Sequence, residues 1–213
     1  DASKSRGLGD VYKRQDVTRA LSNSSLTLDL PVDGLKFKTT FALDFVLNAT
    51  HDYQNPIEGD GVGEGGLAEQ DVTRRFTWST INRLEYNTVL GDNDHFISVV
   101  LGQSFQKNKN HYMYAYGEAP AADQLFYVSS FPANRDAAGS FSDWKVLSYL
   151  GVANYSFQDK YIFNFTWRND GSSRFASGYR FGNFFSYGVA WNISNENFLC
   201  LLYTSDAADD WFC

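Results

Sequence analysis

The most regular pattern of hydrophobic and polar positions lies in residues 148–194, which contain three strand-like runs. One face of the middle run would carry four aromatic side chains, Tyr161, Phe163, Phe165 and Trp167. The opposite face would carry the residues between them, which become polar and then charged along the run, Ile162, Asn164, Thr166 and Arg168. Because successive side chains of a strand point to opposite faces, this alternation predicts a strand with lipid on one side and a water-filled lumen on the other.

Other segments show alternation or a β-rich composition of the same kind. We predict strands at about residues 21–30, 35–50, 73–88, 95–107, 146–157, 161–168 and 183–192. Short connections alternate with long ones, the short ones at 31–34, 89–94 and 158–160 and the long ones at 51–72, 108–145 and 169–182. Successive connections of an up-and-down sheet lie at opposite ends, so the short turns fall on one rim and the long loops on the other, as in outer-membrane barrels.

These patterns favour an all-β fold, a fragment of an antiparallel up-and-down transmembrane β-barrel with about seven strands. Such an incomplete barrel would be an open, curved sheet with two free edges. The alternative is a soluble β-sandwich with an aromatic core. It predicts that Phe163, Phe165 and Trp167 are buried between two packed sheets.

Composition narrows the class of protein further. The chain has 213 residues, enough for one ordinary domain, and a net charge of −7, which argues against nucleic-acid binding. Mean hydropathy is −0.37, and no apolar run approaches the roughly 20 residues that a transmembrane helix needs. A helical membrane protein is not indicated, whereas barrel strands, whose hydropathy signal is weak, remain compatible with these values.

The two ends of the chain share a pattern at the level of DNA. Residues 10–15 can be encoded by a DNA word whose reverse complement encodes residues 200–205. Both ends resemble translated transposon sequencing adapters. We therefore expect residues 1–15 and 200–213 to be foreign and residues 16–199 to be a partial β-barrel.

Three segments near the C-terminal end carry a family resemblance. Residues 148–157 read SYLGVANYSF, residues 170–175 read DGSSRF and residues 191–194 read WNIS. Together they resemble the barrel of SusC/RagA-type TonB-dependent outer-membrane transporters. Upstream of about Asp94 the resemblance is to barrel strands in general.

The resemblance implies a barrel of about 22 strands with a plugged lumen, in the outer membrane of a Gram-negative cell. It implies energised import of glycan or peptide oligomers and no enzymatic activity. The implied partners are outer-membrane lipid, a SusD-like surface lipoprotein, the TonB complex and an oligosaccharide or peptide substrate. Two other functions stay open: a soluble carbohydrate-binding β-sandwich, and an outer-membrane β-barrel enzyme with a catalytic cluster near its rim.

The family motif would form a loop that is mainly structural, made of Asp170, Gly171, Ser172, Ser173, Arg174 and Phe175. Asp-Gly starts a turn, the serine hydroxyls bond nearby backbone, and Arg174 can pair with Asp170. The other interpretation is a loop that contacts substrate at the extracellular rim.

Two further groups are candidates for contact with solute. The first consists of polar residues at predicted lumen-facing positions, which would equally suit contacts with a plug: Lys36, Lys38, Asp44, Asn164 and Arg168. The second consists of aromatic residues in the predicted loop 108–145, which would either stack on sugar rings or pack the loop against the barrel mouth: Tyr112, Tyr114, Tyr116, Phe126 and Tyr127.

No cofactor is expected. The histidines His51, His95 and His111 are far apart and lack a zinc-binding spacing. Residues 58–66 read EGDGVGEGG, which is acidic and glycine-rich but lacks the alternate ligand positions of an EF-hand loop. We interpret this segment as a solvated loop tip.

Overall fold

The structure is a computed structural model that describes residues 11–57, 59–91, 94–122 and 125–196. Its elements are β1 (Val11–Asp29), β2 (Leu35–Gln54), η1 (Gly59–Glu64), β3 (Leu67–Leu90), β4 (His95–Glu118), η2 (Val128–Ser130), β5 (Ala133–Phe157), β6 (Tyr161–Ser172), β7 (Phe181–Trp191) and η3 (Ile193–Asn195). Among the described residues, no helix has the length and apolar character needed to cross a membrane.

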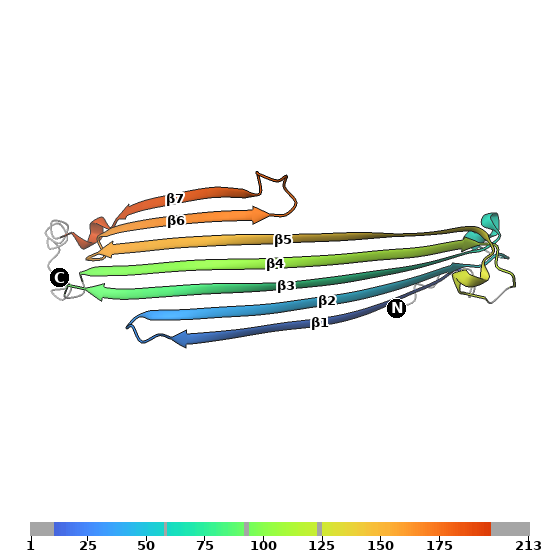
Figure 1. The fold of residues 1–213 in the computed structure, drawn as a ribbon, viewed down its shortest axis with the longest axis horizontal. Helices are drawn as coiled ribbons and strands as arrows, with labels where there is room; N and C mark the ends of the chain where they lie inside the picture. Colours follow the sequence, from blue (N-terminus) through green and yellow to red (C-terminus); the bar gives the residue numbers. More distant parts are fainter. Residues whose placement is uncertain (1–10, 58, 92–93, 123–124, 197–213) are drawn as a thin grey trace, which may run out of the picture. The chain divides into compact units, whose positions relative to one another are not determined.

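The seven strands form one up-and-down antiparallel sheet in which each strand pairs with its sequence neighbour, from β1 to β7 (Figure 1). The predicted all-β fold is therefore confirmed. β1 and β7 are the two edges, so the sheet is not closed within the described part of the chain.

The chain divides into two compact units, a turn unit and a loop unit. Apart from the positions that the structure does not describe, the turn unit holds residues 23–41, 79–106 and 145–196. The loop unit holds residues 11–22, 42–78 and 107–144.

The turn unit contains the three short connections. Backbone hydrogen bonds tie them to neighbouring segments, from Asn87 N to Gly34 O (2.9 Å), from Gln158 N to Asp94 O (2.6 Å) and from Asn192 N to Lys160 O (2.7 Å). Gly34 has a φ of 77°, and a Cβ there would meet the Asn87 carbonyl oxygen, so only glycine fits this turn. The prediction of short turns at one end of the strands is confirmed.

The strand register places the predicted aromatic column on one face. Tyr161 pairs with Phe157 of β5 and with Trp191 of β7. Directly opposite residues of antiparallel strands share a face of the sheet. We call this face of the turn unit the aromatic face, and the other one, which carries Asn164 and Arg168, the polar face.

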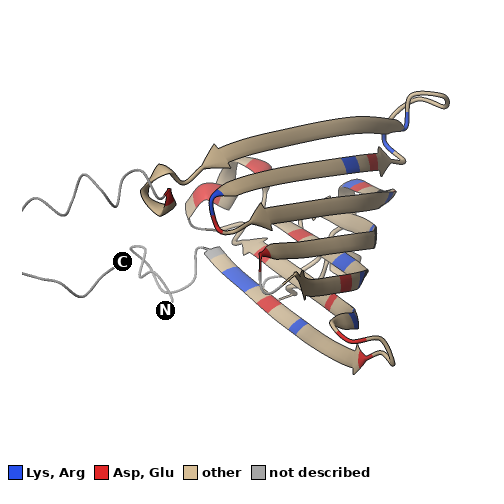
Figure 2. Ribbon diagram, turned by 90° about the vertical axis from the view of Figure 1, so that its left-hand side faces the viewer, with Lys and Arg blue, Asp and Glu red and all other residues tan. Residues whose placement is uncertain are grey.

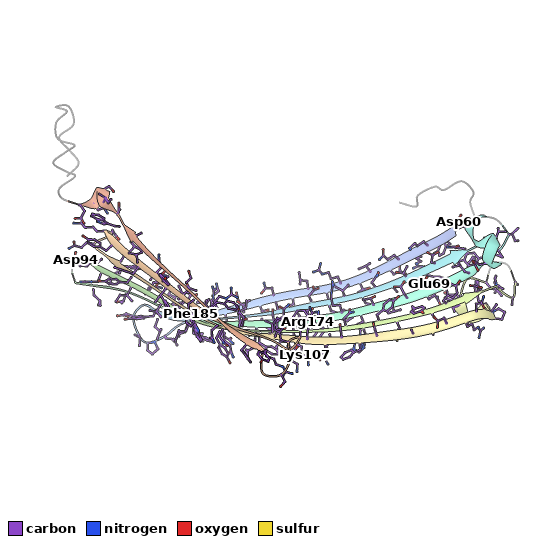
Figure 3. The ribbon with its side chains drawn as sticks, turned by 90° about the horizontal axis from the view of Figure 1, so that it is seen from above. Asp60, Glu69, Asp94, Lys107, Arg174 and Phe185 are labelled. Atoms are coloured by element: carbon purple, nitrogen blue, oxygen red, sulfur yellow. The ribbon has the colours of Figure 1, made fainter. Side chains whose placement is uncertain are left out.

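No second layer covers the aromatic face within the part of the chain that the structure describes. Phe163 and Phe165 are each 46% exposed, and side chains project from both faces of the strands (Figure 3). The β-sandwich alternative, which requires these side chains to be buried between two sheets, is therefore not supported.

The loop unit holds the buried hydrophobic side chains of the described residues. Tyr53 is 2% exposed and Ala68 and Phe131 are fully buried, with Val128 packed against them. The ring of Phe126 meets Tyr53 edge-on, with the ring centroids 4.8 Å apart. This small cluster joins the end of β2 and the start of β3 to η2 and the residue that follows it.

The predicted extent of two long loops was wrong. β2 continues to Gln54 and β3 begins at Leu67, and β4 continues to Glu118 while β5 begins at Ala133. The loops therefore cover residues 55–66 and 119–132 instead of 51–72 and 108–145. Polar and charged side chains occur on both faces of these strand extensions, so backbone pairing holds them while the alternation signal fades.

The N-terminal part of β1 includes residues 11–15, which the sequence predicts to be foreign. Gln15 there donates a hydrogen bond to Asn48 (3.0 Å). The predicted foreign segment 200–213 lies outside the described residues.

Gly171 provides a test of how β6 and β7 pack. It pairs with Phe181, and a Cβ on Gly171 would lie 2.3 Å from the Phe181 ring. We predict that Gly171→Ala lowers the free energy of unfolding of the full-length protein by about 1–3 kcal/mol, because the ring must leave its position. Thermal unfolding followed by circular dichroism measures this change.

The matched control is Gly63→Ala, because no atom lies within 4 Å of a Cβ at Gly63. Its effect should stay within about 0.5 kcal/mol. An unchanged unfolding midpoint for Gly171→Ala would contradict the predicted clash.

Candidate functional site

A ladder of rings crosses the turn end of the aromatic face, with one ring from each of β4 to β7. The ring centroids of His95 and Phe157 are 4.9 Å apart. Phe157 and Tyr161 stack at 6.4 Å, and Tyr161 and Trp191 stack at 6.4 Å with an interplanar angle of 11°. Such stacked cross-strand pairs stabilise a sheet register and form a continuous aromatic row.

The polar groups of two rings in this ladder, Tyr161 and Trp191, bond one carboxylate. Glu196 accepts hydrogen bonds from the Tyr161 hydroxyl (2.7 Å) and the Trp191 indole N–H (3.0 Å), and its other oxygen lies 3.3 Å from Lys160 Nζ. The hydrogen bonds from Tyr161 and Trp191 lower the pKa of Glu196. The row therefore has an apolar body and a charged, hydrogen-bonded rim, as rings at a membrane interface do.

A second polar row marks the other limit of the aromatic column. Asn183 Oδ1 accepts hydrogen bonds from the Trp167 indole (3.2 Å) and from the Asn169 amide (2.9 Å). Tyr161 and Asn169 are separated by about 26 Å along β6, at about 3.3 Å per residue. These nine residues agree with the roughly 9–11 residues with which a tilted strand crosses a membrane.

Charges are absent from most of this band. Residues 95–106 of β4, residues 146–157 of β5 and all of β7 contain no Lys, Arg, Asp or Glu. Figure 2 shows the two charges of β6 near one end of the strand. Further along β4, in the loop unit, charge returns at Lys107, whose Nζ lies 3.6 Å from Asp143.

The position of Leu101 shows which side chains of β2 and β3 lie on the aromatic face. A Cβ on Gly151 would lie 3.5 Å from Trp167 and 3.9 Å from Leu101, so Leu101 is on the aromatic face. Gln103, two residues further, shares that face. A hydrogen-bonded row continues from it across β3 and β2, from Asn82 Nδ2 to Gln103 Oε1 (3.4 Å) and from Thr39 Oγ1 to Asn82 Oδ1 (2.8 Å).

This row shows on which face of the sheet the predicted lumen residues lie. Lys36 and Lys38 alternate with Thr39 and so share the polar face with Asn164 and Arg168. Lys36 Nζ lies 3.2 Å from Asp29, and Arg168 Nη2 lies 3.2 Å from Asp170.

Asn164 lies between Asn154 of β5 and Gly188 of β7 in the register. Gly188 has no side chain to cover Asn164, and the Asn164 side chain is exposed to solvent. The structure adds Arg83 and Glu85 of β3 to the polar face, 3.5 Å apart. Their alternation with Asn82 was the sequence signal that would have found them.

Asp44 belongs to the loop unit and was also predicted to face the lumen. Arg19 of β1 binds it with two hydrogen bonds, Nε to Oδ1 (2.9 Å) and Nη2 to Oδ2 (3.1 Å). This bidentate geometry is the strong form of an arginine–carboxylate pair. It ties β1 to β2, and a role for Asp44 in contact with solute stays a prediction.

The family motif is partly strand. Asp170, Gly171 and Ser172 end β6, and the loop proper covers residues 173–180. Ser173 bonds Lys145 of β5 twice, through its backbone N–H (2.9 Å) and through its hydroxyl, which accepts from Lys145 N (2.8 Å). Asp170 pairs with Arg168 on its own strand, and its pairing with Arg174 stays a prediction.

The loop itself is closed by local bonds. Ser172 Oγ accepts a hydrogen bond from Arg174 N (3.3 Å), and Tyr179 N donates to Ala176 O (3.1 Å). Phe175 is 62% exposed in this loop. These contacts fit the structural interpretation of the motif, in which its serines bond nearby backbone.

Three of the five candidate aromatic residues do not lie in a loop. Tyr112, Tyr114 and Tyr116 alternate along β4. The Tyr114 hydroxyl donates to Asp136 of β5, and the Tyr116 hydroxyl donates to Glu118 (2.6 Å). Burial and the bond to Glu118 raise the pKa of Tyr116 to about 12, with the hydrogen bond as the larger cause.

The other two residues are in the loop 119–132. The Phe126 carbonyl is 2.5 Å from His51 Nε2, and its ring packs on Tyr53. Tyr127 is 64% exposed, and its ring lies 5.4 Å from His51. Phe126 therefore packs the loop, while Tyr127 presents a ring to solvent, and contact of either one with substrate stays a prediction.

Among residues 11–196, apart from the undescribed positions, no three His, Cys, Asp or Glu side chains come together in a way that could hold a metal ion. The acidic segment of η1 folds on its own backbone, with Gly66 N donating to Gly61 O (2.7 Å).

Curated relatives share the sequence over most of the chain. TonB-dependent receptor P3 of Formosa agariphila is 31% identical over 170 residues, a match that covers 79% of this chain and 17% of that protein. TonB-dependent receptor P26 of the same organism is 31% identical over 141 residues, covering 65% and 14%. TonB-dependent receptor SusC of Bacteroides thetaiotaomicron is 50% identical over 54 residues, covering 25% and 5%. No protein-family model matches the chain.

The chain thus spans about a sixth of the length of the first of these relatives, 17% of it. Solved structures show the same fold. The RagAB peptide transporter superposes with a TM-score of 0.78 at 22% identity, over 88% of this chain and 21% of that one. The RagAB peptide importer in its open-open state gives a TM-score of 0.78 over 89% of this chain.

Glu118 joins β4 to β5 and supplies a test by pH. The Tyr116 hydroxyl and then the Asn134 amide donate to its carboxylate and lower its pKa. A lowered folded-state pKa means that the bonds stabilise the loop unit above the unfolded pKa, about 4.3, and that this stabilisation is lost as the pH falls through the folded pKa. We predict that amide protection of residues 119–122 and 125–132, corrected for the intrinsic exchange rate, decreases on acidification below about pH 4.

Glu118→Gln is the control, since its amide has no such titration. In this variant, the amide protection of the same loop should not change over the same pH range. A pH step of equal size in Glu118→Gln would assign the loss of protection to another group.

Proposed function

Because this chain is a barrel segment of a SusC/RagA-type TonB-dependent receptor, we propose that it forms part of the wall of an outer-membrane importer of glycan or peptide oligomers. The observation that carries the proposal is the aromatic band of the turn unit. Rings fill it, polar rows limit it at Glu196 and Asn183, and between these rows β6 has about the number of residues with which a tilted strand crosses a membrane.

The strand lengths agree with this assignment. β6 and β7 have 12 and 11 residues, close to the 9–11 residues with which a tilted strand crosses a membrane. We propose that the aromatic face contacts outer-membrane lipid of a Gram-negative cell. The short turns would face the periplasm, since outer-membrane barrels keep their short turns on that side.

We propose that the polar face lines the water-filled interior. Lys36, Lys38, Asn164 and Arg168 would contact solute or the plug of the whole receptor, and Tyr127 would contact solute at the mouth. The solved relatives are described as a peptide transporter and importer, which supports peptides as one substrate class. The resemblance to SusC supports a surface lipoprotein and the TonB complex as partners of the whole protein.

We further propose that the chain has no catalytic activity of its own, because the relatives it matches are receptors. Residues 1–15 and 200–213 would be of foreign origin. A genomic DNA sequence read across both junctions tests this assignment of the ends.

Membrane placement is tested by adjacent substitutions on β6. We predict that Phe165→Arg, in the middle of the aromatic face, destabilises the full-length receptor in lipid vesicles by about 2–4 kcal/mol, because a charge at mid-bilayer depth must be desolvated. Urea unfolding in vesicles, together with the amount of folded receptor in the outer membrane, measures the effect.

Two matched variants of β6 serve as controls for the face and the depth of the substitution. Thr166→Arg, on the polar face, should cost less than about 1 kcal/mol, and Tyr161→Arg, at the edge of the band, about 0–1 kcal/mol. Equal costs for Phe165→Arg and Thr166→Arg would exclude a lipid-facing role for the aromatic face.

Import is tested in cells. We predict that deleting the whole receptor gene abolishes uptake of a fluorescent peptide or a fluorescent malto-oligosaccharide, and that dissipating the proton-motive force does the same. Restoring the gene should restore uptake. Unchanged uptake of both probes in the deletion strain would contradict the proposed function for these substrates.

A further inference from the structure

One edge of β5 has no partner among the described residues. β5 pairs with β6 from Phe157 to Val146, where Val146 lies opposite Ser172. β6 ends at Ser172 and β7 begins at Phe181, yet β5 extends back to Ala133. Residues 133–144 therefore have a neighbouring strand on the β4 side only, within the part of the chain that the structure describes.

Lys145 shows which backbone groups point to this edge. Its N–H donates to Ser173 Oγ (2.8 Å) and its carbonyl accepts from Ser173 N (2.9 Å), so both groups point toward β6. The N–H and C=O groups of successive residues in a strand point alternately to its two sides. Asp143, Phe141, Gly139 and Ala137 consequently present their N–H and C=O groups to the same open side.

Exposed strand edges of natural proteins are commonly blocked by lysine, proline or a bulge, because an open edge pairs with any extended chain. Residues 134–143 read NRDAAGSFSD, with neither lysine nor proline, and all ten are exposed. Ala137, Ala138 and Gly139 are small, so a strand of varied side chains would fit beside them.

We propose that this free edge, residues 137–143, binds a peptide in extended conformation by adding it as a strand to β5. The edge offers donors and acceptors that repeat with the backbone spacing, and only another peptide backbone matches that repeat. Sugar hydroxyls have no such array. The inference rests on the proposed import function and assigns this edge to peptide, not to glycan.

Space and position agree with a peptide ligand. A hollow of about 270 Å³ adjoins the first residue of the free edge, since Ala137 lines it together with Tyr116 and Val128, among others. In strand addition, such pockets accept alternate side chains of the bound peptide.

The free edge must lie in water. A backbone group without a partner costs several kcal/mol in lipid, so a row of them is tolerated only outside the bilayer. In the proposed orientation, the far ends of the long strands are extracellular, which is the side from which a peptide substrate arrives.

The test uses the full-length receptor in detergent and three probes. They are a fluorescent decapeptide of Ser, Thr and Val, the same peptide methylated on alternate backbone nitrogens, and a fluorescent malto-oligosaccharide. We expect the decapeptide to bind at least about tenfold more tightly than its methylated form, because methylation removes several hydrogen bonds. Amides 137, 139, 141 and 143 should exchange fast in the free receptor and become protected by the decapeptide.

Ala137→Pro should weaken decapeptide binding about three- to tenfold, because it removes one N–H from the free edge at a position where an edge strand accepts proline. Ala137→Val keeps that N–H and should bind within about twofold of the unchanged receptor. If Ala137→Pro fails to fold, the proposal is still tested by comparing the affinities of the methylated and unmethylated peptides for the unchanged receptor.

Three results would overturn the proposal: equal affinity for methylated and unmethylated peptide, binding of the malto-oligosaccharide alone, or protection of the four amides without any peptide. The last would mean that another segment of the receptor covers the edge. Each of these three results concerns binding or exchange in the purified receptor. Failure of the proposed function would instead be seen in cells, as unchanged uptake of both probes after deletion of the receptor.

Discussion

Pairing of backbone N–H and C=O groups is the constraint on which the other features of this chain depend. In lipid no water replaces a missing partner, so each unpaired group costs several kcal/mol. In the turn unit, β6 pairs with both neighbours from Tyr161 to Gly171 without a break in register. Once the backbone is satisfied within the sheet, the side chains of one face are free to contact lipid directly.

This constraint explains why so large a sheet has so small a core. Tyr187 is 86% exposed and Val189 is 71% exposed, which would make an aggregation-prone patch in a soluble protein. In the proposed placement, lipid covers these residues and removes them from water. Packing inside the chain is needed only where loops fold back in water, and there Tyr53 and Phe131 supply it.

The sequence predicted the turn ends of the strands better than the loop ends. At the turns, Gly34 and residues 158–160 impose local geometry that the sequence shows directly. At the far ends both faces meet water, so apolar alternation fades although the strands continue, and Tyr112 to Tyr116 were assigned to a loop. Contacts between distant residues were not visible either: Gly171 is required by the Phe181 ring, and Ser173 bonds Lys145 across the sheet. Alternation alone placed Lys38 and Arg168 on one face.

The unequal strand lengths follow from the same backbone rule. β6 and β7 have about the length that crosses a bilayer, whereas β5, with 25 residues, extends well beyond it. Inside the bilayer a partner strand is obligatory, so β5 is paired wherever β6 exists. Beyond it water satisfies the backbone, and β5 can keep an open edge at little cost. In the proposed placement, the wall segment thus combines a part in lipid, whose backbone is fully paired, with a part in water, whose open edge offers its N–H and C=O groups to the proposed peptide ligand.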